Sequence, residues 1–157
     1  DQSLDIEQVG TALTQALEAR PDILRDTRFA IELGRWLVAE AGVYMAHVVD
    51  IKDSGGERFA ILDGGLNHQL AASGNFGTVV RRNYPLALAH AMGAEAIQTV
   101  SVVGPLCTPL DRLGDRVALP AVHVGDIVAI FLAGAYGASA SPSAFLGHGP
   151  ADEILAR

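Results

Sequence analysis

The stretch "VYMAHVVDIKDSGGERFAILDGG" at residues 43–65 decides the fold class. Its first arm, 43–52, is rich in β-branched and aromatic residues, which favour strands, and its second arm is "RFAILDGG" at 58–65. The link between the arms, "SGGE" at 54–57, holds two consecutive glycines, which suit a tight turn between antiparallel strands. The stretch therefore predicts a β-hairpin.

Further strand-like segments follow the hairpin. They are "AIQTVSVVG" (96–104), "VALPAVHVGD" (117–126) and "DIVAIFLAGAY" (126–136). The part at 66–93 is ambiguous, and "NYPLALAHAM" (83–92) within it could include a short helix. From the hairpin onward we expect a mostly antiparallel β-domain with glycine and proline turns.

The chain has a different character before the hairpin. Residues 5–19 have a helical pattern, with Asp5 as the N-cap and Pro21 beyond the end. The apolar stripe of this helix consists of Val9, Leu13 and Leu17. "RFAIEL" (28–33) is a short apolar run that suits a buried strand. Because one helix and one strand cannot close a core, we expect residues 1–42 to end an α/β domain whose remainder is absent.

Composition and charge restrict the class of protein. The 157 residues are 50% hydrophobic and 18% charged, which indicates a folded globular domain. The net charge of -7 and the lack of a lysine or arginine block argue against nucleic acid as a partner. The longest apolar run, "IVAIFLAGAYGASA", is interrupted by glycines and is shorter than the roughly 20 residues of a membrane span. A single cysteine cannot form an internal disulfide, which suits a reducing, cytoplasmic setting.

Four stretches, in order, carry a resemblance to a known family. They are "ELGRWLVAEAGVY" (32–44), "VVGPLCTPLD" (102–111), "GDIVAIFLAGAYGASAS" (125–141) and "SAFLGHGPADEIL" (143–155). Together they resemble the C-terminal part of the fold-type III pyridoxal-phosphate decarboxylases, the group that acts on ornithine, lysine, arginine or diaminopimelate. "GGLNHQLAASGNFG" with "RRNYP" further resembles a subgroup associated with exosortase loci and with aminoacyl substrates bound to carrier proteins.

The resemblance implies an architecture and partners. The family has a TIM barrel followed by an alanine-racemase-like β-barrel or sandwich domain, and each active site forms between two subunits of a homodimer. Residues 1–42 would be the last helix and strand of an otherwise absent barrel, and 43–157 the antiparallel β-domain. The lysine that binds pyridoxal phosphate would belong to the absent barrel, and Lys52, on a predicted outer strand, is not assigned that role. The full protein would be a carboxy-lyase, and this chain alone would be inactive, without lysine-dependent visible absorbance in the presence of the cofactor.

The resemblance also implies cofactor contacts. Glu32 would face the pyridine nitrogen and keep it protonated. Gly34 would let the backbone approach the cofactor phosphate, and Arg35 would add charge-assisted hydrogen bonds there. Tyr136 would bring its hydroxyl near the phosphate in the neighbouring subunit. Judged on the residues alone, Glu32 and Arg35 could instead form a surface salt bridge, and Tyr136 could be an aromatic of the β-core.

Cys107 lies between a Gly-Pro and a Thr-Pro turn, which predicts a position where a strand ends and a loop begins. The resemblance implies that it enters the partner subunit's active site and returns a proton to the substrate after CO2 leaves; alternatively, it could be a buried spectator. Thr108 stands where enzymes for basic substrates have an acid, so the substrate would not be free lysine or ornithine. Asp111 would brace the loop.

Further residues are predicted to lie near the substrate pocket. Phe145 follows an aromatic that lines the family's pocket near the interface. Arg81, with Arg82 and Tyr84, could bind a substrate carboxylate or a carrier arm, or could be part of a solvated basic pair. The histidines have no metal-ligand spacing, so no metal is expected, and His68 could line the pocket. Two alternative functions remain open: a non-catalytic decarboxylase-like module for dimerisation or regulation, and an unrelated β-barrel binding protein.

Overall fold

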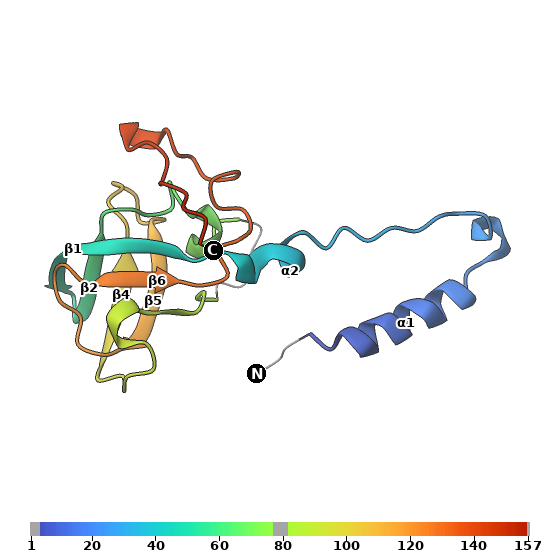
Figure 1. Cartoon of the computed structure of the whole chain (residues 1–157), viewed down its shortest axis with the longest axis horizontal. Helices are drawn as coiled ribbons and strands as arrows, with labels where there is room; N and C mark the ends of the chain where they lie inside the picture. Colours follow the sequence, from blue (N-terminus) through green and yellow to red (C-terminus); the bar gives the residue numbers. More distant parts are fainter. Residues whose placement is uncertain (1–3, 77–81, 157) are drawn as a thin grey trace. The chain divides into compact units, whose positions relative to one another are not determined.

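A computed structural model describes residues 4–76 and 82–156 of the chain (Figure 1). The chain divides into two compact units, and the division falls between Glu32 and Leu33. We call them the N-terminal unit (residues 4–32) and the sheet unit (residues 33–156). The predicted compositional boundary near residue 42 lies inside the sheet unit, because the main chain at 39–42 accepts hydrogen bonds from the main chain at 133–134. That residues 1–42 end a TIM barrel stays a prediction.

The N-terminal unit holds helix α1 (Ile6–Glu18) and the 3-10 turn η1 (Asp22–Leu24). Asp5 caps α1 as predicted, since its carboxylate accepts a hydrogen bond of 3.0 Å from the Gln8 N–H. None of the described residues of this unit is buried.

The strand predicted at 28–33 is wrong. This segment has no regular secondary structure, and its Phe29 and Ile31 side chains are exposed. A strand is stable only when a neighbouring strand receives its main-chain hydrogen bonds, and the described residues of the N-terminal unit contain no other strand. The apolar pattern of these residues therefore has no partner within the unit.

The sheet unit begins with the short helix α2 (Gly34–Val38) and the 3-10 turn η2 (Ala39–Ala41). Among the described residues, six strands follow: β1 (Tyr44–Ser54), β2 (Glu57–Leu62), β3 (Leu86–Leu88), β4 (Gln98–Val103), β5 (Arg112–Leu119) and β6 (Ile127–Ile130). They form one sheet in the order β3-β6-β1-β2-β4-β5. All neighbours are antiparallel except β2 and β4, which confirms the mostly antiparallel prediction.

The predicted hairpin is confirmed. Strands β1 and β2 pair up to Ser54 and Glu57, and the turn consists of Gly55 and Gly56 with φ of +60° and +77°. Glycine suits both positions because its missing Cβ permits positive φ without strain. In the ambiguous region, 83–92 forms the short strand β3 and the 3-10 turn η4 (Ala89–Ala91).

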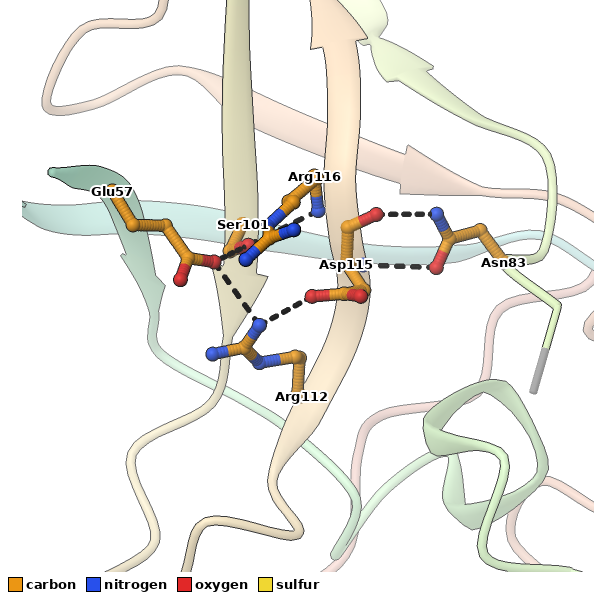
Figure 2. Close-up of polar contacts among 6 residues, drawn as sticks. All are labelled: Glu57, Asn83, Ser101, Arg112, Asp115 and Arg116. Carbon is orange, nitrogen blue, oxygen red and sulfur yellow. Dashed lines mark hydrogen bonds and ion pairs between the residues drawn. The ribbon is translucent and has the colours of Figure 1, made fainter.

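The sheet closes on itself almost completely. Strands β3 and β5 stand at opposite ends of the strand order, yet the Leu86 side chain packs against Gly114, where an added Cβ would lie 2.8 Å from it. Just before β3, the Asn83 side chain donates to the Asp115 carbonyl (2.7 Å) and accepts from the Asp115 N–H (2.8 Å) (Figure 2). Asn83 thereby substitutes for a strand neighbour, and the six strands form a nearly closed barrel, as predicted.

The hydrophobic core lies inside this barrel. Buried aliphatic side chains come from all six strands, among them Val48, Leu62, Leu88, Val102, Leu113 and Ile130. Burial alternates along the first half of β1, as expected for a strand with one face toward a core. Within the described residues, no helix is long and apolar enough to cross a membrane.

A polar network ties three strands of the barrel wall together (Figure 2). The Arg112 guanidinium on β5 pairs with the Glu57 carboxylate on β2 at 3.0 Å and with the Asp115 carboxylate. On β4, the Ser101 hydroxyl donates to Glu57 and accepts from the Arg116 N–H at 3.0 Å. Because the Arg112 and Glu57 side chains are only about a quarter exposed (26% and 22%), this pair is less screened by water than a surface pair. The charge of Arg112 is therefore engaged within the barrel wall.

Candidate active site

The Cys107 loop (residues 104–111) connects β4 to β5, and it carries Cys107 exposed on its surface. The position between a strand end and a loop is as predicted. The alternative of a buried spectator cysteine is wrong, because turns on both sides keep residue 107 out of the barrel core. An exposed thiol on a loop can reach a group outside its own domain.

Asp111 anchors this loop, as predicted. Its carboxylate is buried, and it accepts hydrogen bonds from the Leu66 N–H (2.7 Å) and the Leu106 N–H (2.9 Å). Gly65 and Gly104 lie directly against the same carboxylate, where a Cβ on either would collide with it. A buried carboxylate with two main-chain donors is a strong anchor, because charge-assisted bonds are about twice as strong as neutral ones. The Cys107 loop is thus fixed to the segment at 64–66.

Thr108 is half-buried, and its hydroxyl accepts a hydrogen bond of 3.3 Å from the Leu110 N–H within the loop. A groove of about 390 Å³ lies beside it, lined among others by Lys52, Phe59, Leu106 and Pro109. Lys52 is exposed on β1, which lies between β6 and β2; the prediction of an outer strand was therefore wrong. Thr108 brings no negative charge to this groove, so it offers a substrate ammonium group no ion pair.

Three of the predicted cofactor residues come together elsewhere in the sheet unit. The Arg35 guanidinium carbon lies 5.3 Å from the centre of the Tyr136 ring, and a Cβ on Gly34 would collide with the Tyr136 hydroxyl. The same guanidinium lies 5.6 Å from the centre of the Tyr84 ring, and the Phe76 ring packs on Tyr136 at 5.1 Å. We call these five residues the Arg35 cluster. Cation–π contacts with two rings hold the guanidinium in place.

Tyr136 is half-buried in the turns after β6 with φ of +58°, so the alternative of an aromatic in the β-core is wrong. Its hydroxyl lies at Gly34 of its own chain. The predicted contact with a phosphate in the neighbouring subunit stays a prediction. Strand β6 ends at Ile130, earlier than predicted, because the chain turns through positive φ at Leu132 and again at Tyr136. These turns carry Tyr136 to Arg35.

Two polar atoms of the Arg35 cluster are buried and have no hydrogen-bond partner among the described residues: the Arg35 Nε and the Tyr84 hydroxyl oxygen. Leaving a buried donor unsatisfied costs about 1–3 kcal/mol, so such atoms are rare and mark places where a ligand or water belongs. Burial raises the pKa of Tyr84, and the positive charge of Arg35 partly offsets this, so the hydroxyl remains a proton donor at neutral pH. A guanidinium with phenol hydroxyls and a glycine suits an anion, and a phosphate ester fits this set of donors.

Sequence reasoning did not find several of these residues. Tyr84 was associated with Arg81 and Arg82, not with Arg35, and Phe76 was not singled out. Gln69, whose carboxamide oxygen abuts Gly137, also has a buried nitrogen without a partner. The aromatic next to a proline in "RRNYP" is the one local signal for Tyr84, and Gln69 carries none.

The remaining predicted residues are more dispersed. Glu32 is exposed in the N-terminal unit, so its role toward the cofactor stays a prediction. Phe145 is 47% exposed on the 3-10 turn η5 (Phe145–Gly147). Arg81 lies outside the described residues. His68 accepts or donates one hydrogen bond with the Tyr44 hydroxyl (3.0 Å) and lies 3.2 Å from the Gly149 carbonyl.

No group of three or more His, Cys, Asp or Glu side chains that could hold a metal ion occurs in the described part of the chain.

Comparisons with known proteins place the chain in a family. The family model "Pyridoxal-dependent decarboxylase, C-terminal sheet domain" matches residues 16–134. The chain is 42% identical over its whole length to the L-glutamyl-[BtrI acyl-carrier protein] decarboxylase of Niallia circulans, covering 37% of that protein. It is 34% identical over 83% of its length to the diaminopimelate decarboxylase of Archaeoglobus fulgidus, covering 30% of it.

A solved structure agrees with these relatives. The lysine/ornithine decarboxylase of Vibrio vulnificus, complexed with cadaverine, matches 96% of the chain with a TM-score of 0.73 and 26% identity. The match covers 38% of that protein, so the chain spans between 30% and 38% of the length of these three relatives. The chain belongs to the pyridoxal-phosphate-dependent decarboxylase family and corresponds to its C-terminal sheet domain.

Proposed function

We propose that this chain is the C-terminal portion of a pyridoxal-phosphate-dependent decarboxylase that acts on an amino acid or an aminoacyl-carrier protein. In this proposal the chain contributes cofactor- and substrate-contacting residues at the interface of a homodimer. The Arg35 cluster carries the proposal: it gathers Gly34, Arg35 and Tyr136 in one place and leaves two buried donors without partners. Such donors favour a module that binds a ligand over one that serves only dimerisation or regulation.

The proposed cofactor residues would bind the phosphate group and keep the pyridine nitrogen protonated. Arg35, Gly34 and Tyr136 would hold the phosphate of pyridoxal phosphate, and Glu32 would face its pyridine nitrogen. When bound, the cofactor supplies a ring that takes up the electron pair left when CO2 departs. The fixed position of the Arg35 guanidinium over two rings means that little side-chain freedom is lost when the phosphate binds.

Cys107 would hold a proton and deliver it to the substrate α-carbon in the partner subunit's active site. The exposure of the thiol favours this role, because a group that acts on another subunit has to project from its own domain. The two main-chain hydrogen bonds of Asp111 would keep the loop in one conformation, so that the sulfur meets the substrate in a defined geometry. An exposed thiol of this kind also suits the reducing cytoplasm.

The substrate would be a small amino acid, either free or bound to a carrier protein. Thr108 offers a neutral hydroxyl that is already used within the loop, so a distal ammonium group would find no ion pair with residue 108. This argues against free lysine and ornithine. The relative from Niallia circulans, whose name gives it a glutamyl group on an acyl-carrier protein, supports a carrier-bound substrate.

Exposed apolar residues support the proposed partners. The α1 stripe is more than a third exposed, and Phe145, Leu146, Ile154 and Leu155 are between 47% and 91% exposed. The missing barrel portion and a second copy of the protein would cover surfaces of this kind. Phe145 would line the substrate pocket near that interface, and Arg81 would bind a substrate carboxylate or the carrier arm.

The experiment uses this chain joined to the TIM-barrel portion that would precede it in the full protein. CO2 release would be measured from a glutamyl-carrier protein, glutamate, lysine and ornithine, with pyridoxal phosphate present. Arg35→Gln should raise the cofactor Kd about a hundredfold, because a charge-assisted contact is lost. Cys107→Ala should lower kcat about a hundredfold and leave the cofactor Kd unchanged. Arg58→Gln, at an exposed position on β2, is the matched control and should change neither.

Two results would contradict the proposal. If the joined protein bound no pyridoxal phosphate and released no CO2, the alternative of a non-catalytic dimerisation or regulatory module would hold instead. Efficient turnover of lysine or ornithine would refute the role given to Thr108. The chain without its TIM-barrel portion should have no lysine-dependent visible absorbance with the cofactor. The lysine that binds the cofactor would belong to that portion, and Lys52 lines the groove beside Thr108 and is not part of the Arg35 cluster.

A further inference from the structure

We propose that Tyr84 is a further residue of the phosphate site and that its hydroxyl donates a hydrogen bond to the same phosphate group as Arg35. This inference rests on the proposed function, because it concerns the anion that the Arg35 cluster would hold. It adds a direct contact from the segment just before β3, which no part of the proposed function assigns to the cofactor.

The first argument is the state of the three tyrosine hydroxyls. The Tyr44 hydroxyl has a partner, the His68 Nδ1 at 3.0 Å, and the Tyr136 hydroxyl lies against Gly34. The Tyr84 hydroxyl is buried and bonds no other atom of residues 4–76 and 82–156. A buried hydroxyl that served only packing would be replaced at no loss by the phenylalanine ring, which has the same shape without the polar atom.

The second argument is the neighbour of this hydroxyl. The Tyr84 ring lies under the Arg35 guanidinium at 5.6 Å, and the Arg35 Nε is likewise buried without a partner. Two unsatisfied donors in residues that contact each other indicate one acceptor shared by both. The acceptor must come from outside the described residues, because none of their atoms bonds either donor.

The third argument is the chemistry of that acceptor. The polar side chains of the Arg35 cluster are a guanidinium and two phenols, which donate protons at neutral pH and carry a net positive charge. An acceptor with several oxygens and a negative charge satisfies such a set, and a phosphate ester has three terminal oxygens for it. A carboxylate with two oxygens would leave one of the donors with a poorer bond.

The experiment compares two ligands that differ only in the phosphate. The Kd of pyridoxal phosphate and the Kd of pyridoxal would be measured for the chain joined to its barrel portion, in the wild type and in Tyr84→Phe. Phenylalanine keeps the ring over Arg35 and removes the hydroxyl. We expect Tyr84→Phe to raise the Kd of pyridoxal phosphate about tenfold and to leave the Kd of pyridoxal unchanged.

Tyr44→Phe is the matched control, because it also removes the hydroxyl of a half-buried tyrosine but lies outside the Arg35 cluster. It should leave the ratio of the two Kd values at its wild-type value. If Tyr84→Phe does not stay folded at the assay temperature, Tyr84→Gln, which keeps a donor, and Tyr84→Leu, which does not, give the same comparison.

The outcomes separate this inference from the proposed function. A wild-type protein that prefers pyridoxal phosphate over pyridoxal, together with a Tyr84→Phe variant that keeps the full preference, overturns the role of Tyr84 and leaves the proposed function intact. A wild-type protein that binds neither ligand overturns the proposed function itself. Loss of the preference in Tyr84→Phe, with the Tyr44→Phe ratio unchanged, supports the inference.

Discussion

The two units of the chain use similar aliphatic residues with opposite results. In the N-terminal unit, Leu17 lies on the apolar stripe of α1 and is 36% exposed, and no described residue of that unit is buried. In the sheet unit, Leu113 on β5 is 0% exposed. The apolar stripe of a helix is buried only when another element packs against it. A nearly closed sheet, in contrast, buries its own apolar face.

Closure of the barrel explains why the sheet unit needs no outside cover for its core. A flat sheet with one apolar face requires a second layer, but a sheet whose end strands meet encloses that face. Here the Asn83 side chain and the Leu86–Gly114 contact join the two ends. The described residues of the N-terminal unit contain no such device, and none of them is buried.

The largest expected effect contrasts the two leucines directly. Leu113→Ala should lower the free energy of unfolding of the sheet unit by about 3 kcal/mol, because it leaves a cavity in the core. Leu17→Ala should change that free energy by less than about 0.5 kcal/mol. Urea unfolding followed by the fluorescence of Trp36, the sole tryptophan and a residue of α2, measures both. Equal losses for the two variants would break the comparison.

A smaller effect is expected at the anchor of the Cys107 loop. Asp111→Ala should lower the free energy of unfolding by about 2 kcal/mol, since the Leu66 and Leu106 N–H groups lose their acceptor. The same variant should speed the reaction of Cys107 with a thiol reagent, because the loop is no longer fixed. Asp53→Ala, which removes an exposed carboxylate from β1, is the control. An unchanged melting curve for Asp111→Ala would show that the anchor is dispensable.

The smallest expected effect depends on pH and concerns Tyr44. Burial, and then the charges of Asp63 and Asp111, raise the pKa of Tyr44 in the folded chain well above its ordinary value of 10.0. The unfolded chain therefore ionises first, so this stability is fully present below pH 10 and is lost as the pH rises above it. The loss is about 1.4 kcal/mol for each pH unit above 10.

Unfolding free energies of the wild type and of Tyr44→Phe between pH 8 and about pH 11 test this expectation. Below pH 9, the difference between the two unfolding free energies should stay constant to within about half a kcal/mol. At higher pH the wild type should lose stability relative to Tyr44→Phe, because only the wild type has the phenol that ionises in the unfolded chain. If the unfolding free energies of the two proteins ran parallel over the whole pH range, a group other than Tyr44 would cause the loss of stability at high pH.

Local features of the fold could be predicted well from the sequence. The Asp5 cap, the end of α1 before Pro21 and the Gly55–Gly56 turn each depend on residues adjacent in the chain. The strand at 28–33 was predicted wrongly for the opposite reason: an apolar run becomes a strand only beside a partner strand. The early end of β6 depends on the turn at Leu132, and leucine is not a residue type that predicts a turn.

The candidate site could be predicted only in part. Motif resemblance gave Arg35, Tyr136 and Cys107, and the structure brings the first two together. Tyr84 was named without its true neighbour, because its contact with Arg35 depends on how the segment before β3 meets the segment around α2. The contact between these segments follows from the strand order and the closure of the barrel, and no local sequence pattern predicts either.

The sequence by itself determined the capped helix, the glycine hairpin, the exposed turn that carries the single thiol and the family resemblance. These depend on backbone preferences and on neighbours a few residues apart. Only the tertiary structure decided that Asp111 anchors the Cys107 loop and that two tyrosines hold Arg35 with two donors left unsatisfied. The physical reason is that burial and hydrogen-bond partners are properties of the packed chain, because they arise only when distant segments exclude water from one another.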